Sequence, residues 1–264
     1  MSNEGPGVSL RSILVFLDPA ANAQGVLQVG VGLARQHGAH LVGLQAVPEE
    51  TGRSGAGTEA LEQAFREQVT QWRLSHEWCW ATGDKEARVV LEARAHDLLV
   101  IGHAPPHGSR LWPQSDHLLE SVLIKSGHPV IAVPHQGSFT SVGERVLVAW
   151  SGAREVARAV EDAMPILEKA DHVTLLTADL RSGDALSIDH LVALLERHGV
   201  DVAVRGARSL GRPVGDVLLA EAHALHCDLL VMGGYGHAPI REHLFGGVTY
   251  FVIEHMTLPV LLSH

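Results

Sequence analysis

Two nearly identical stretches decide the fold of this chain: DLLVIG at residues 97–102 and DLLVMG at residues 228–233. They lie 131 residues apart. Two further pairs of apolar stretches flank these and match in the same order along the chain: ILVFLD (13–18) with VLVAWS (146–151), and PVIAV (129–133) with PVLLS (259–263). Collinear matches at offsets of 133, 131 and 130 residues indicate a duplicated unit with small insertions.

Within each copy, short apolar runs alternate with longer stretches of helical periodicity. The first copy predicts strands near 12–17, 40–46, 78–81, 97–101 and 130–133, and helices near 21–37, 59–76, 85–95 and 115–126. The second predicts strands near 145–150, 172–177, 200–204, 229–232 and 259–262, and helices near 154–169, 188–197, 214–226 and 241–255. This alternation predicts an α/β fold of two tandem repeats, each a five-stranded parallel sheet between helix layers. We expect domains at 1–136 and 143–264, joined by a linker at 134–144.

Composition and charge argue against several classes of function. The formal net charge is −10 and no basic stripe is present, which argues against nucleic-acid binding. No apolar run reaches the roughly 18–20 residues that a membrane span needs, and no secretory signal is visible at the start, so we expect a cytoplasmic protein. The 18 histidines form no recognised metal motif, and no metal site is predicted.

The most informative segment follows the fourth strand of the second copy. It reads MGGYG at residues 232–236 and, after nine further residues, GGVT at 246–249. Glycines allow a backbone to turn with positive φ and to approach a ligand closely. Two glycines inside a regular helix would cost roughly 1 kcal/mol each relative to alanine. Close approach of a phosphate, or of another backbone, explains why they are tolerated.

The segment and its flanks resemble the universal stress protein family, whose nucleotide-binding members carry G-x2-G-x9-G-[S/T]. The resemblance covers nearly the whole chain as two copies. It implies a Rossmann-like fold of the adenine-nucleotide alpha-hydrolase type. It also implies a binding site in the second copy: Gly233, Gly236, Gly246 and Gly247 at the phosphates, Val248 near the ribose, Ser151 and Gly152 facing the adenine, and Met232 lining the pocket.

Both copies depart from that family pattern. In the second copy Gly247 stands where the motif has Ser or Thr, with Thr249 as an uncertain substitute, and Ser151 stands where nucleotide binders have Asp. In the first copy Asp18 is present, but the glycine loop has become GHAPP at 102–106, with Glu120-Ser121 at the expected closing position. Prolines remove amide donors that a phosphate cradle would use.

The resemblance implies a regulatory, non-catalytic or barely catalytic stress-response protein that binds ATP, ADP or AMP in its second domain. Whether Mg²⁺ accompanies ATP is left open. The alternative is a nucleotide-free interaction module acting through dimerisation or partner surfaces. A third hypothesis gives the first-copy pocket a more apolar ligand. The final strands, 130–133 and 260–262, are expected to pair the two domains within one chain, and a homodimer is a further expectation.

Overall fold

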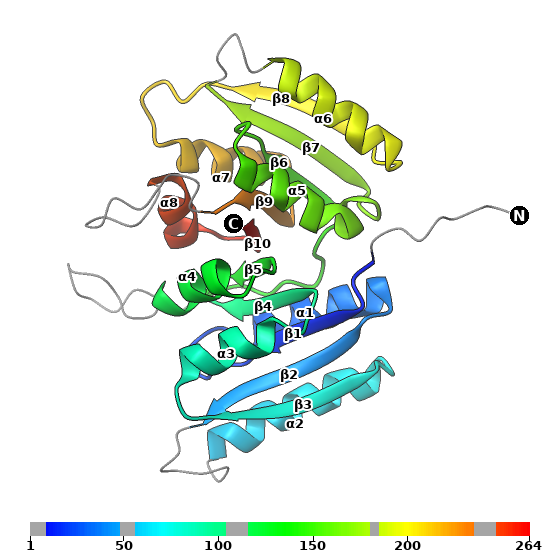
Figure 1. Cartoon of the computed structure of the whole chain (residues 1–264), viewed down its shortest axis with the longest axis vertical. Coiled ribbons are helices and arrows are strands. Elements are labelled where there is room, and N and C mark those ends of the chain that lie inside the picture. Colours follow the sequence, from blue (N-terminus) through cyan, green and yellow to red (C-terminus); the bar gives the residue numbers. More distant parts are fainter. Residues whose placement is uncertain (1–8, 48–55, 104–115, 180–184, 235–246) are drawn as a thin grey trace, which may run out of the picture. The chain divides into compact units, whose positions relative to one another are not determined.

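The computed structural model describes residues 9–47, 56–103, 116–179, 185–234 and 247–264. The chain divides into two compact units between Thr140 and Ser141, a boundary that lies inside the stretch 134–144 expected as linker. In both units helices cover the two faces of a β-sheet (Figure 1).

The first unit alternates strands and helices throughout. In the described residues its elements are β1 (Ser12–Phe16), α1 (Ala23–His37), β2 (His40–Val47), α2 (Ala56–Gln71), β3 (His76–Thr82), α3 (Lys85–Ala93), β4 (Leu98–Gly102), α4 (Asp116–Lys125) and β5 (Val130–Val133).

The second unit repeats this order. Its described elements are β6 (Arg145–Ala149), α5 (Arg154–Leu167), β7 (His172–Ala178), α6 (Ala185–Arg197), β8 (Val202–Ala207), α7 (Val214–Ala224), β9 (Leu229–Gly233), α8 (Gly247–His255) and β10 (Val260–Ser263).

Each unit has a parallel sheet of five described strands, which confirms the predicted fold class. The order is β3-β2-β1-β4-β5 in the first unit and β10-β9-β6-β7-β8 in the second. The inner strands are apolar and almost entirely buried, as expected for a sheet covered on both faces. In the second unit the order reverses between β6 and β9, and ligands of such sheets bind beside the carboxyl ends of strands at this point.

The aspartate that opens the repeated DLLV motif has the same structural role in both units. Asp97 accepts hydrogen bonds at 2.7 and 2.9 Å from the backbone amides of residues 11–12, where β1 begins. Asp228 accepts hydrogen bonds at 2.9–3.1 Å from the amides of residues 143–145, where β6 begins. These carboxylates fix the start of the first strand, at the sheet edge opposite the glycine segment.

The clearest departure from the predicted elements is the end of α2. A helix was predicted over 59–76 and a strand from 78, but α2 ends at Gln71 and β3 begins at His76. Arg73 adopts a left-handed conformation (φ 53°) that ends the helix. Glycine is the usual residue at such a position, so the sequence carried no stop signal there.

Two kinds of feature are absent from the residues that the structure describes. None of their helices is both long and apolar enough to cross a membrane. Nor does any group of three or more His, Cys, Asp or Glu among them lie close enough together to hold a metal ion.

Candidate functional site

A cavity of about 470 Å³ opens in the second unit at the carboxyl ends of β6, β7 and β9. Its volume is within the range of small-molecule sites. The described residues that line it come from these strand ends and from the starts of three helices: Ala149, Trp150, Ser151, Ala153, Glu155, Val156, Leu176, Ala178, Val214, Leu218, Met232, Gly233, Gly247, Val248 and Thr249.

One side of the cavity is apolar. Trp150 follows β6 and its backbone amide bonds the carbonyl oxygen of Leu176 on β7 at 2.8 Å. Leu176 and Met232 are buried, and Val214 and Leu218 of α7 also line the cavity. An aromatic ring beside aliphatic side chains provides a surface for a flat heteroaromatic group such as a purine.

The other side is built from the amino ends of two helices. Gly152 turns the chain after β6 with φ 76°, and α5 then begins behind Ala153, which offers no capping side chain. The first helical turn of α8 contributes Gly247, Val248 and the buried Thr249. Helix amino ends present unpaired amide groups and a positive partial charge, which suit an anionic ligand.

Six of the nine predicted site residues line this one cavity: Ser151, Met232, Gly233, Gly247, Val248 and Thr249. Gly152 turns the chain beside it but is not among the lining residues. Gly236 and Gly246 lie outside the described residues. Gly247 was expected within a helix, and it lies in α8, whose described residues are Gly247–His255.

The structure separates the roles of two of the glycines. A Cβ atom on Gly233 would lie 2.6 Å from the backbone nitrogen of Val156 and 2.7 Å from the carbonyl carbon of Glu155. Gly233 therefore permits α5 to pack against the end of β9. No described atom lies within 4 Å of the position that a Cβ on Gly247 would take. Local packing thus explains Gly233, whereas no neighbour among the described residues accounts for Gly247.

Glu155 is a charged site residue that the sequence analysis missed. It belongs to the first turn of α5, lines the cavity, and is only 6% exposed. Arg154 Nε donates a hydrogen bond to its Oε1 at 2.7 Å, while the Arg154 side chain itself is largely in solvent. This ion pair, helped by the residue's own backbone amide and by nearby His264, lowers the pKa of the Glu155 carboxyl. The position of Glu155 in the first turn of α5 carried no sequence signal, because its burial comes from contact with the end of β9.

In the first unit, the residues after β1 and at the start of α1 make different contacts. Asn22 caps α1 by accepting from the amide of Gly25 at 2.9 Å, and its Nδ2 donates to the carbonyl oxygens of Pro134 and Gly137. Asp18, the aspartate that follows the first strand, forms an ion pair with Lys85 at 3.0 Å. In this unit the start of α1 and the carboxylate of Asp18 therefore already interact with other groups of the protein.

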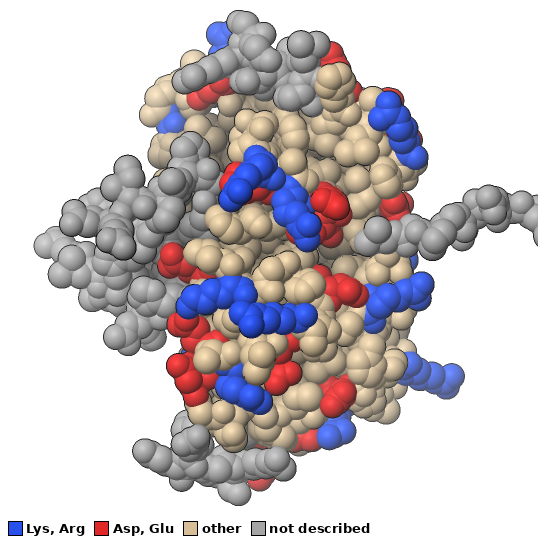
Figure 2. Space-filling view, viewed as in Figure 1, with Lys and Arg blue, Asp and Glu red and all other residues tan. Residues whose placement is uncertain are grey.

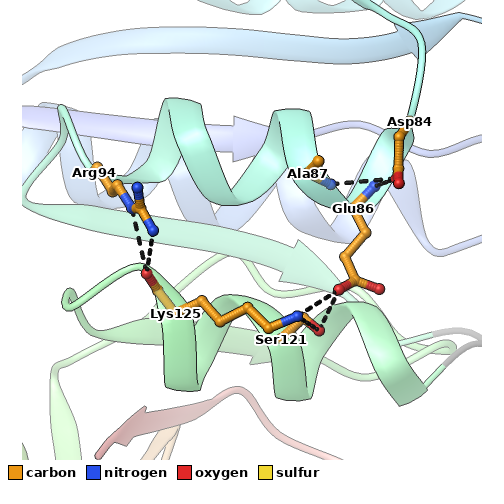
Figure 3. A network of polar contacts seen from close by, with 6 residues as sticks. All are labelled: Asp84, Glu86, Ala87, Arg94, Ser121 and Lys125. Atoms are coloured by element: carbon orange, nitrogen blue, oxygen red, sulfur yellow. Dashed lines mark hydrogen bonds and ion pairs between the residues drawn. The ribbon is translucent and has the colours of Figure 1, made fainter.

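Ser121, at the position where the glycine motif was expected to close, lies in α4, as the predicted helix over 115–126 requires (Figure 3). Its hydroxyl donates to Glu86 Oε1 at 2.5 Å, and Lys125 Nζ donates to the same oxygen at 2.9 Å. Arg94 donates to the carbonyl oxygen of Lys125 at 3.1 and 3.3 Å. These contacts join α3 to α4, so the role of Ser121 here is to hold two helices together.

Comparisons with known proteins agree with this architecture. Residues 144–264 match the model of the universal stress protein family. Along 96% of this chain and 97% of the other, the fold is similar to a universal stress protein from Archaeoglobus fulgidus DSM 4304, with TM-score 0.75 and 19% identity. It is also similar to a functionally unknown protein from Pseudomonas aeruginosa PAO1, with TM-score 0.66, 16% identity and coverage of 96% and 92%. No curated protein sequence matches significantly.

The second unit is therefore a domain of the universal stress protein family. The first unit repeats its fold, and along 96% of the chain the two-unit fold is similar to that of the solved protein from Archaeoglobus fulgidus.

Proposed function

We propose that the second domain binds an adenine nucleotide, of the ATP, ADP or AMP type, as a regulatory ligand of a stress response. The observation that carries the proposal is the cavity at the β6–β9 switch point, which combines apolar walls with the amino ends of α5 and α8. The apolar walls suit a purine ring, and the helix ends suit a phosphate. The family match of residues 144–264 supports the same ligand class.

We further propose that the protein is non-catalytic or only barely catalytic. Its response would then depend on occupancy of the site and not on turnover. A phosphate-release assay with ATP and Mg²⁺ tests this directly, and steady release at rates typical of enzymes would contradict it. The cytoplasmic location, the homodimer and the pairing of the two domains remain predictions from the sequence.

The distribution of charged side chains and the net charge favour a small-molecule ligand over a nucleic acid. Figure 2 shows Lys and Arg side chains interspersed with Asp and Glu, with no continuous basic stripe on the visible face. Together with the net charge of −10, this distribution would repel a polyphosphate backbone.

The alternative is a nucleotide-free interaction module. The packing role of Gly233 favours it, because this glycine is explained without a ligand. The open space around Gly247 favours the nucleotide site, because no described neighbour requires a glycine there.

Isothermal titration with ATP–Mg²⁺, ADP and AMP distinguishes the two functions. In Gly247→Leu a side chain from the first turn of α8 would compete with the ligand for the cavity, while leucine favours the helix. We expect the wild type to bind and the variant to lose at least about tenfold in affinity, or about 1.4 kcal/mol.

Gly32→Leu is the matched control. Gly32 lies in α1 of the first unit, and no described atom lies within 4 Å of its virtual Cβ. This variant should bind like the wild type. No heat from any nucleotide with the wild type would favour the interaction module, and equal binding by Gly247→Leu would remove the ligand from this cavity.

A further inference from the structure

We infer that Glu155 is a specificity-determining residue of the proposed nucleotide site, and that it selects adenosine and adenosine monophosphates over the triphosphate. The inference rests on the proposed function, and it concerns which members of the ligand class the cavity accepts.

Glu155 is the acidic residue of the cavity lining. Among the described residues that line the cavity, it is the only one with an ionisable side chain. It lies between the start of α5 and the end of β9, where a Cβ on Gly233 would be 2.9 Å from the Cβ of Glu155. A ligand in this cavity therefore binds beside an acidic residue.

The carboxylate is ionised at neutral pH. Arg154 donates to it, and His264 lies close enough to favour its charged form. His264 Nδ1 is 3.2 Å from the carbonyl oxygen of Gly234, so this nitrogen carries the proton and donates. The guanidinium of Arg154 is in solvent, where water and salt weaken its field. It therefore offsets the negative charge of Glu155 only in part on the side that faces the cavity.

Two physical consequences follow for the ligand. The carboxylate already interacts with the positive amino end of α5 and accepts a hydrogen bond from its own backbone amide. This helix end is therefore less able to bind a phosphate. An ionised carboxylate only accepts hydrogen bonds, so it favours hydroxyl or amino donors, such as those of a ribose or an adenine, and repels phosphate oxygens. Each additional phosphate should therefore weaken binding, unless a cation accompanies it.

Titrations of adenosine, AMP and ATP in EDTA test the inference. They compare the wild type with Glu155→Gln, which keeps the shape of the side chain and removes its charge. We expect the ratio of ATP to adenosine affinity to rise by about tenfold or more in Glu155→Gln, with adenosine itself nearly unchanged. Glu161→Gln is the matched control, because Glu161 is an exposed residue of α5 that does not line the cavity. It should leave the ratio as in the wild type.

An unchanged ratio in Glu155→Gln would overturn the inference, and so would an equal rise in both variants, which would point to net charge alone. Should Glu155→Gln fail to fold, Glu155→Met removes the same charge at similar length and faces the same criterion. Failure of the proposed function has a different signature, namely that none of the three ligands binds the wild type or any variant.

Discussion

His96 is a half-buried imidazole between the end of α3 and the start of β4. Its Nδ1 and the hydroxyl of Ser12 are hydrogen bonded at 2.6 Å. Burial lowers the pKa of His96, and neighbouring His40 lowers it further, while the carboxylates of Glu92, Asp97 and Glu77 oppose the shift. Burial is the largest effect, so the folded protein favours the neutral ring.

This balance predicts a pH dependence of stability. Because the unfolded histidine, with a pKa near 6.5, binds a proton more readily than the folded one, stability from His96 is present above about pH 6.5. It is lost as the pH falls through the lower folded pKa. Urea denaturation at pH 7.5 and 5.5 should show a smaller loss of stability in His96→Asn than in the wild type. An equal loss in both proteins would contradict the assignment.

The candidate site shows which residues a sequence can identify. The glycine segment and the first-strand tip were identified through the resemblance to the universal stress protein family, and six of those residues line the cavity. Glu155 was missed because its importance comes from burial beside β9, which lies about 75 residues further along the chain and is visible only in the folded sheet. The apolar wall from Leu176 and Leu218 was missed for the same reason.

At the scale of elements, the packing of the first helix against the fourth strand recurs in both units. A Cβ on Gly233 would lie 2.6 Å from the backbone of α5, whereas a Cβ on Gly102 would lie 2.9 Å from the Cβ of Ala21 and 3.2 Å from Val26 Cγ2. Backbone atoms of a helix cannot move aside without shifting the whole element, but Ala21 lies in the turn before α1, which can shift more easily, and the Val26 side chain can adjust.

This difference predicts a graded series of alanine substitutions. We expect Gly233→Ala to cost about 2–3 kcal/mol, Gly102→Ala about 1 kcal/mol, and Gly247→Ala to be neutral or slightly stabilising. Urea denaturation followed by circular dichroism measures the series, each substitution acting on the transition of its own unit. Equal costs at Gly233 and Gly247 would contradict the packing role assigned to Gly233.

Strand and helix positions followed closely from apolar periodicity, because buried parallel strands read as continuous apolar runs. The ends of elements were less predictable. The helix α2 stops before a left-handed arginine, Arg73, and β8 begins at Val202, two residues later than predicted. Tertiary contacts set these boundaries, and local sequence preference does not encode them.

At the scale of the whole molecule, the two copies of the fold differ at the carboxyl end of the first strand and the start of the helix that follows it. In the second unit the amino end of α5 borders a cavity, while in the first Asn22 caps the equivalent helix and holds residues 134 and 137. The repeat itself was readable from the sequence, but this division of roles was not. We therefore expect one nucleotide per chain.

A crystal structure of the wild-type protein grown with saturating AMP tests the central claim most directly. The account predicts one AMP per chain, in the second unit, with its purine against Trp150 and Leu176 and its phosphate toward the start of α8. Diffraction data that show this cavity without nucleotide, or filled by the protein's own side chains, would contradict it.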